Sequence, residues 1–340
     1  MIRDGSTGSG DHTTSPARIV AGHESPAGED APPLANPRRA RLAKHPWRAL
    51  LVILALQPVC YALVGLVLYG VLRLPRDLSN MESFSTSLLF TVGGLLAYLV
   101  VPFLLHLPMG RRTITQYLDD IRLTRVRPVV PLLVLTLSCD LVLILCMGSG
   151  SLVYRLSEGK PLTGEFVRHV FDLSLALPPQ SMLLFAQFFS SFEEVLFRGV
   201  FLTMLLATLP ARRAIVYSAL AFGLMHLPAV LAGQPLVPTL GQVVWAFLFG
   251  LFYGYLFLQS GSLLPPMIIH WLSNVFQAPL TAYWWHTAPA PLNTLYGIVF
   301  GYGLATLLLL PWVRFFCARW LPRPSGATAY PQPQALTQRP

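Results

Sequence analysis

Two acids and an arginine interrupt a long apolar run between Ser181 and Leu209. Glu193 and Glu194 are adjacent, and Arg198 follows Glu194 by one helical turn. An acid followed by a base at this spacing favours an ion pair on one helix face. Glu193 projects about 100° away around the same helix. Charges inside an apolar segment are costly and usually mark function, so we predict that Glu194 pairs with Arg198 and that Glu193 is free for chemistry.

A structural explanation competes with the functional one for part of this pattern. Gln187 lies on the same helical stripe as Glu194 and Arg198, which is also typical of a polar seam between packed helices. That explanation leaves Glu193 unaccounted for. Asp140, in another apolar run, has two interpretations, as a buried partner for Arg198 or a backbone donor, or as part of a hydrophilic cavity. We favour pairing, because charges inside membranes are usually paired.

Two later apolar runs each carry residues one helical turn apart. Phe222 precedes His226 by four positions, and His270 precedes Asn274 by four. A single histidine or asparagine in such a run often serves only as a hydrogen bond between helices. Together with Glu193, these side chains supply a base, groups that orient water and donors for an oxyanion. Those are the parts that hydrolysis requires.

The composition is that of a membrane protein with several spans. Of the 340 residues, 54% are hydrophobic and 11% are charged, and the mean hydropathy is +0.57. These values exclude an ordinary soluble enzyme. The net charge of +9 comes largely from arginines in tails and loops, which indicates membrane orientation rather than nucleic-acid binding. The four cysteines show no C-x-x-C spacing, so we expect neither a disulfide framework nor a thiolate zinc site.

Apolar runs predict an all-α, polytopic transmembrane helical bundle of about eight spans. They cover residues 49–72, 87–107, 129–148, 179–209, 214–231, 241–259, 264–284 and 294–312. Alternate loops and both ends carry an excess of basic residues, which favours the cytoplasmic side. We therefore expect an integral protein of the cell membrane with both termini in the cytoplasm. The basic residues are Arg38, Arg39, Arg41, Lys44, Arg48, Arg111, Arg112, Arg122, Arg125, Arg127, Arg212, Arg213, Arg314, Arg319 and Arg323.

The order of the three polar motifs resembles that of a known family. E-E-x-x-x-R, then F-x-x-x-H, then H-x-x-x-N, each on its own apolar helix, is similar to the CPBP family of intramembrane proteases. That family includes CAAX prenyl endopeptidases and bacteriocin-immunity relatives. The motifs cover about residues 179–285, and the earlier spans and the last one carry no motif that matches.

The resemblance implies a role for each polar residue. Glu193 would be the general base that activates a water molecule, and His226 would help to hold that water. His270 and Asn274 would stabilise the tetrahedral oxyanion. Glu194 and Arg198 would orient the site and adjust its charge.

Composition, the apolar runs and the resemblance together predict a division of the chain. Residues 1–46 would be a disordered basic tail, 47–178 the N-terminal transmembrane helices and loops, and 179–285 the catalytic core. Residues 286–316 would hold the last transmembrane helix, and 317–340 a disordered C-terminal tail.

The need for a metal stays open at the level of sequence. Glu193, His226 and His270 form the two-histidine, one-carboxylate set that catalytic zinc uses. The helical H-E-x-x-H pattern of many zinc proteases is absent, and a metal-free glutamate mechanism fits at least as well. We therefore expect either no cofactor or zinc, with a slight preference for no metal.

The predicted function is intramembrane endopeptidase activity on a membrane-associated substrate, in which Glu193 activates water. The resemblance suggests a prenylated CAAX protein, and a signal, leader or bacteriocin peptide is the other substrate class. The alternative is a non-catalytic membrane scaffold or bacteriocin-immunity protein that binds a partner in the same cavity. A proton-coupled transporter that uses Asp140, Glu193 and His226 is weaker, because repeated halves are not evident. The expected partners are the lipid bilayer and a membrane-associated protein or peptide, and not nucleic acid.

Overall fold

The computed structural model describes residues 42–77, 80, 83–110, 113–231 and 233–321. These residues belong to one compact unit, Ala35–Pro340. Most of the two predicted tails, and the predicted basic residues Arg38, Arg39, Arg41, Arg111, Arg112 and Arg323, lie outside the described residues. Helix α15 (Leu304–Trp320) includes residues 317–320, so the predicted C-terminal tail at 317–340 begins too early.

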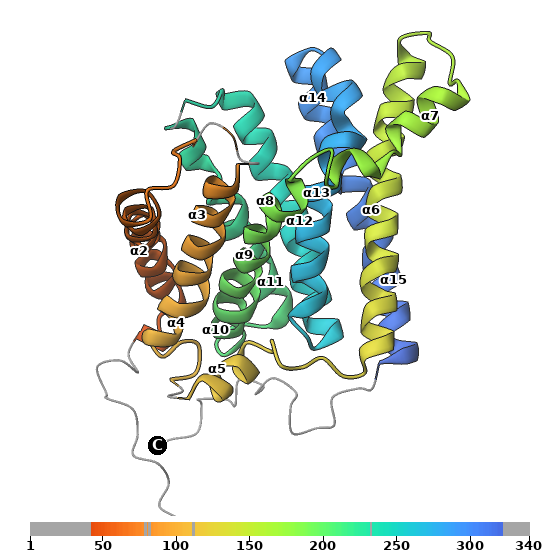
Figure 1. Ribbon diagram of the computed structural model, residues 1–340. Helices are drawn as coiled ribbons and strands as arrows, with labels where there is room; N and C mark the ends of the chain where they lie inside the picture. Colours follow the sequence, from red (N-terminus) through yellow and green to blue (C-terminus); the bar gives the residue numbers. More distant parts are fainter. Residues whose placement is uncertain (1–41, 78–79, 81–82, 111–112, 232, 322–340) are drawn as a thin grey trace, which may run out of the picture. The chain divides into compact units, whose positions relative to one another are not determined.

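The described residues contain helices and no strands, which confirms the predicted all-α bundle (Figure 1). Six helical segments among them are long and apolar enough to cross a membrane, so the chain is an integral membrane protein. They are Pro46–Val71, Phe84–Leu104, Val129–Ser157, Ala211–Val230, Leu236–Ser260 and Pro291–Trp320. The predicted count of eight spans is therefore not confirmed.

The other two predicted runs are helical, and they are the two that carry the charged motif and the His270 motif. The first consists of α8 (Leu183–Ala186), the 3₁₀ turn η4 (Gln187–Phe189), α9 (Ser190–Glu194), the π-helix η5 (Val195–Leu202) and α10 (Thr203–Leu206). The second is α13 (Leu264–Thr287), whose apolar face is interrupted by His270, Asn274 and Gln277. Polar side chains lower the mean hydropathy of a segment, so a functional helix loses part of the signal that identifies a span.

Most of the remaining spans are also built from several helical segments. Helix α2 (Pro46–Gly65) continues as the π-helix η1 (Leu66–Val71), and α3 (Phe84–Leu95) continues as η2 (Leu96–Val100) and α4 (Val101–Leu104). Helix α6 (Val129–Ser157) is uninterrupted. Short helices and turns follow in the connections, at α5 (Ile114–Asp120), α7 (Gly164–Val170) and η3 (Leu173–Ala176). The last span joins α14 (Ala290–Tyr296), η7 (Gly297–Gly303) and α15.

Helices α11 (Ala211–Leu224) and α12 (Leu236–Ser260) pack closely because small residues face each other, and the turn η6 (Leu227–Val230) connects them. A Cβ added to Gly250 would lie 2.9 Å from Ala219 Cα, and one added to Gly223 would lie 2.7 Å from the Val243 carbonyl oxygen. Small residues allow helix backbones to approach in membranes, where van der Waals packing drives association. Because His226 follows the end of α11, the α11–α12 contact also fixes the position of His226 along α12.

A short connection sets α13 against α12. Helix α12 ends where Gly261 takes the left-handed conformation, with φ of +68°, which is accessible to glycine at little cost. Helix α13 begins three residues later with Pro265 and Pro266 in its first turn, where a missing N–H leaves no bond unmade. The Leu263 N–H donates to the Arg122 carbonyl and ties this connection to the α5 region.

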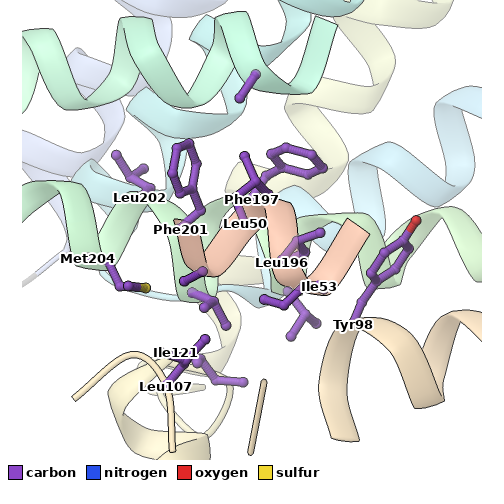
Figure 2. Close-up of a cluster of buried hydrophobic side chains, with 14 of the residues drawn as sticks. Leu50, Ile53, Tyr98, Leu107, Ile121, Leu196, Phe197, Phe201, Leu202 and Met204 are labelled. Atoms are coloured by element: carbon purple, nitrogen blue, oxygen red, sulfur yellow. The ribbon is translucent and has the colours of Figure 1, made fainter. Parts of the chain in front are cut away.

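The segment that carries the charged motif lies in the core. All eight residues of η5 are buried. Figure 2 shows Leu196, Phe197 and Phe201 of this helix among side chains from α2 and from the α3–α4 span. Helix α9, just before η5, contacts both α3 and α13. A second cluster joins α6, α12, α13 and α15, so the two glutamates lie where the two halves of the bundle meet.

Candidate functional site

The backbone changes register immediately after the two glutamates. Glu194 is the last residue of α9, and η5 follows as a π-helix. Side chains from nearby residues bind two of its carbonyl groups. Ser218 Oγ donates to the Phe197 carbonyl at 2.9 Å, and Thr203 Oγ1 donates to the Arg198 carbonyl at 3.4 Å. π-Helical segments occur frequently at functional sites, but η1, η2 and η7 are π-helical as well, so the two glutamates and not the π-helix distinguish this segment.

Glu194 and Arg198 form the ion pair that their spacing predicts. Arg198 Nη1 donates to Glu194 Oε1 at 3.1 Å, and both side chains have no exposed surface. His270 Nδ1 lies 2.8 Å from the same carboxylate oxygen. Helix α13 is thereby joined to α9 through one acceptor atom. The other oxygen, Glu194 Oε2, has no hydrogen-bond partner.

Arg198 makes three contacts in addition to its ion pair with the Glu194 carboxylate. Nη2 donates to the Gly250 carbonyl at 3.4 Å. The guanidinium carbon lies 4.4 Å from the centre of the Phe222 ring and 5.3 Å from that of Tyr253. Aromatic faces attract a cation most strongly where water is excluded. The positive charge is therefore fixed deep in the bundle, on the side of η5 that faces α11 and α12.

Gly250→Ala is expected to lower the free energy of unfolding by about 1–3 kcal/mol, because the added methyl group overpacks the contact with Ala219. The shift of α12 would also move the Gly250 carbonyl away from Arg198. Thermal unfolding in detergent measures the effect. Gly301→Ala is the matched control, because a Cβ there meets no atom within 4 Å. Equal stability of the two variants would contradict the assigned role of the α11–α12 contact.

His226 lies just beyond the C-terminal end of α11. Its Nδ1 is 3.0 Å from the Phe222 carbonyl oxygen, which belongs to the last turn of the helix. The last four carbonyls of a helix have no N–H partner of their own within it, and a histidine side chain is one way to satisfy them. The helix end therefore orients the His226 ring and leaves Nε2 free of this contact.

These contacts assign the ring protons of both histidines. A backbone carbonyl only accepts, so His226 Nδ1 carries a hydrogen, and an ionised Glu194 likewise makes His270 Nδ1 the donor. In its neutral form each ring then presents an unprotonated Nε2. His270 donates through Nε2 only as an imidazolium.

A polar cavity of about 360 Å³ brings four of the six predicted site residues together. Glu193 enters it from α9, His226 from the end of α11, and His270 and Asn274 from α13. Glu193 is partly exposed, whereas Glu194 is fully buried behind it. Glu194 and Arg198 do not line this cavity. Each contacts a residue that does: Glu194 contacts His270, and Arg198 contacts the Phe222 ring.

Several further polar residues of the polar cavity are absent from the predicted set. Gln242 of α12 and Gln277 of α13 line it, and Tyr302 of η7 donates to Gln277 Oε1 at 3.0 Å. Gln187, which the sequence analysis assigned to a seam or a site, lines it as well. Gln277 follows Asn274 by three positions and therefore lies on the same face of α13. An amide inside an apolar run, one turn from another amide, was the signal available in the sequence.

The residues proposed as zinc ligands share the cavity without forming a ligand set. Within the described part of the chain, no group of three histidine, cysteine, aspartate or glutamate side chains lies close enough together to hold a metal ion. This arrangement of Glu193, His226 and His270 therefore does not fit a three-ligand zinc centre.

Asp140 lies apart from this site. It is buried on α6, and its Oδ2 has no hydrogen-bond partner. The polar contacts of Arg198 described above go to Glu194 and Gly250, so the predicted pairing of Asp140 with Arg198 is not made. Asp140 does not line the polar cavity either.

Comparison with known proteins identifies the segment that carries the site. Residues 176–276 match the family described as type II CAAX prenyl endopeptidase Rce1-like. The match includes all six predicted site residues and confirms the resemblance to the CPBP family. It supports a CAAX-type intramembrane protease in general over a non-catalytic scaffold. No curated protein and no solved structure matches the chain.

Proposed function

We propose that this chain, whose residues 176–276 match the type II CAAX prenyl endopeptidase Rce1-like family, is an active endopeptidase that hydrolyses a peptide bond in a lipid-modified, membrane-associated substrate. The observation that carries the proposal is the single partly exposed carboxylate of the polar cavity, Glu193, which faces the same space as His226, His270 and Asn274.

The proposed reaction uses water as the nucleophile. Glu193 takes a proton from water while the water oxygen bonds to the scissile carbonyl carbon, and the electron pair of the C=O bond moves to oxygen. The Asn274 amide and His270, as imidazolium, stabilise that oxyanion. The C–N bond then breaks, and Glu193 returns the proton to the leaving amine. The products are a new carboxylic acid and a new amine.

An apolar groove supports the lipid-modified substrate class. A groove of about 550 Å³ lies between α3, α8 and α13, and its lining includes Leu88, Phe185, Phe188 and Trp271. Trp271 directly follows His270 and donates from Nε1 to the Leu184 carbonyl at 2.7 Å. A hydrocarbon chain bound in this groove would lie next to the peptide segment that enters the polar cavity. The basic loops further support the proposed orientation, with both termini in the cytoplasm of a cell-membrane protein.

The decisive experiment is cleavage of membrane-tethered peptides by the purified protein in H₂¹⁸O. The panel contains prenylated CAAX peptides and the same peptides without the lipid. We expect cleavage of the prenylated set, one ¹⁸O atom in the new carboxyl group, and no loss of activity with a strong chelator. Binding of every peptide without cleavage would favour the scaffold alternative, and loss of activity on chelation would contradict the metal-free route.

Asn274→Ala is expected to lower kcat by about 10²–10³-fold, because the variant removes an amide donor to the oxyanion. Binding of the uncleaved peptide should change little, since the donor acts mainly in the transition state. The kcat and KM values of a cleaved peptide, compared with those of Gln187→Ala as a lining control, measure the effect. A rise in KM at constant kcat would assign Asn274 to substrate binding instead.

A further inference from the structure

A second cavity also has Glu193 in its lining. It has a volume of about 420 Å³, and its lining includes Gln57, Tyr61, Phe90, Tyr98 and Glu193. We call it the α2-side cavity. Glu193 and Phe189 line both this cavity and the polar cavity. One carboxylate therefore faces two spaces, and only one of them contains His226, His270 and Asn274.

Two adjacent glycines of α3 set the position of Tyr61. A Cβ added to Gly93 would lie 2.5 Å from the Tyr61 ring, so only glycine leaves room for the ring there. A Cβ added to Gly94 would lie 3.6 Å from the Tyr61 hydroxyl, 3.7 Å from Phe192 and 3.9 Å from Phe189. The hydroxyl of Tyr61 is thus held beside the two phenylalanines that flank the start of the glutamate motif.

Tyr98 reaches the same space from the continuation of α3, one helical turn after Gly94. It lies in η2 and is 1% exposed. Figure 2 shows its side chain projecting away from its own helix, with the hydroxyl at the far end. The lining of the α2-side cavity therefore includes two hydroxyl groups, one amide and one carboxylate. Buried water requires two to four polar partners, and this lining supplies them.

We propose that the α2-side cavity supplies the water consumed in each cleavage, with Tyr61, Tyr98 and Gln57 as the groups that position it next to Glu193. The proposal rests on the hydrolytic function proposed above. A substrate that fills the polar cavity displaces water from it, and hydrocarbon surroundings offer none. Hydrolysis uses one water molecule per turnover, so a route through the α2-side cavity keeps the base supplied while the substrate is bound.

The first test measures bound water without any substrate. Hydroxyl radicals generated by an X-ray pulse from water beside a side chain oxidise that side chain, and mass spectrometry locates the oxidation. Tyr98 and Tyr117 are a matched pair, because each is 1% exposed. Tyr117 donates its hydroxyl to the Leu99 carbonyl at 3.0 Å and lines neither the polar cavity nor the α2-side cavity. We expect oxidation of Tyr98 and not of Tyr117. Equal oxidation of the two, or none, would overturn the proposal.

The second test uses the cleavage assay. Tyr61→Phe removes one hydroxyl group and should lower kcat about tenfold while KM stays constant. Tyr69→Phe is the control, because the Tyr69 hydroxyl on the same span has no hydrogen-bond partner. Phe90→Trp fills the α2-side cavity and should lower both kcat and the oxidation of Tyr98. A rise in KM with unchanged kcat would make this cavity a substrate site and overturn the water route.

The two tests separate this proposal from the proposed function. If the wild-type protein cleaves no peptide while Tyr98 is oxidised and Tyr117 is not, the hydrolytic function fails and the hydrated cavity remains. If the protein cleaves peptides while Tyr98 stays unoxidised, the function remains and the water route fails.

Discussion

Glu193→Gln is expected to lower kcat by about 10²–10⁴-fold, the contribution of a positioned general base, and to leave the fold intact. The glutamine keeps the size of the side chain and removes its ability to take a proton from water. Glu193 makes no ion pair with Arg198, which instead binds Glu194, so its charge is not needed to balance that cation. Single-turnover cleavage of a prenylated peptide, together with thermal unfolding in detergent, measures both effects.

Glu194→Gln is the matched comparison at the neighbouring position. Its amide still accepts from Arg198 and His270, but the charge that stabilises the Arg198 cation is lost. We expect a loss of stability as well as of activity, because a buried cation without its counter-ion is costly. Equal unfolding temperatures for the two glutamine variants, or retained activity in Glu193→Gln, would contradict the division of roles between the two glutamates.

Arg198→Met is expected to lower the free energy of unfolding by about 3–5 kcal/mol, which is the cost of leaving a buried charge without its partner. Glu194 has no exposed surface, so bulk solvent does not replace the guanidinium. The variant also leaves the Phe222 ring without its cation. Denaturation in mixed detergent micelles measures the loss.

The double variant Arg198→Met with Glu194→Gln tests the cause. Removing the second charge should recover a large part of the lost stability, because a neutral pair of similar volume replaces a buried ion pair at little cost. Double-mutant cycles isolate the coupling between the two side chains. If the double variant is no more stable than Arg198→Met alone, packing around Arg198 rather than charge would account for the loss.

Local spacing was enough to predict the parts of the site that lie on one helix. The Glu194–Arg198 pair follows from one helical turn, and both side chains are fully buried as expected for a pair inside a bundle. The three polar motifs on separate helices also predicted a shared cavity, because unpaired polar groups in apolar helices face one another rather than lipid. Glu193, His226, His270 and Asn274 line one space.

Contacts between distant helices were beyond the sequence. The bond from His270 to Glu194 joins residues 76 positions apart, and no local pattern encodes that distance. Tyr61 and Tyr98 carry no motif, because a tyrosine in an apolar run is equally typical of ordinary packing. The count of eight spans is not confirmed for a related reason. The polar residues of α13 and the charged residues of α9 and η5 weaken the apolar signal by which these two segments would be recognised as spans.

The π-helix after Glu194 makes the site depend on the number of residues as well as on their identity. A π-helical turn holds more residues than an α-helical turn, so η5 can lose one residue by tightening to α-helical pitch without turning the segment before it. The same deletion in α10, which is already α-helical, would turn both glutamates by about 100° relative to the residues that follow. That angle is the same as the angle between Glu193 and Glu194, so the second deletion would leave every motif intact and yet bring the wrong carboxylate to the cavity. Relatives with intact motifs are therefore expected to differ in length within η5 and not within α10.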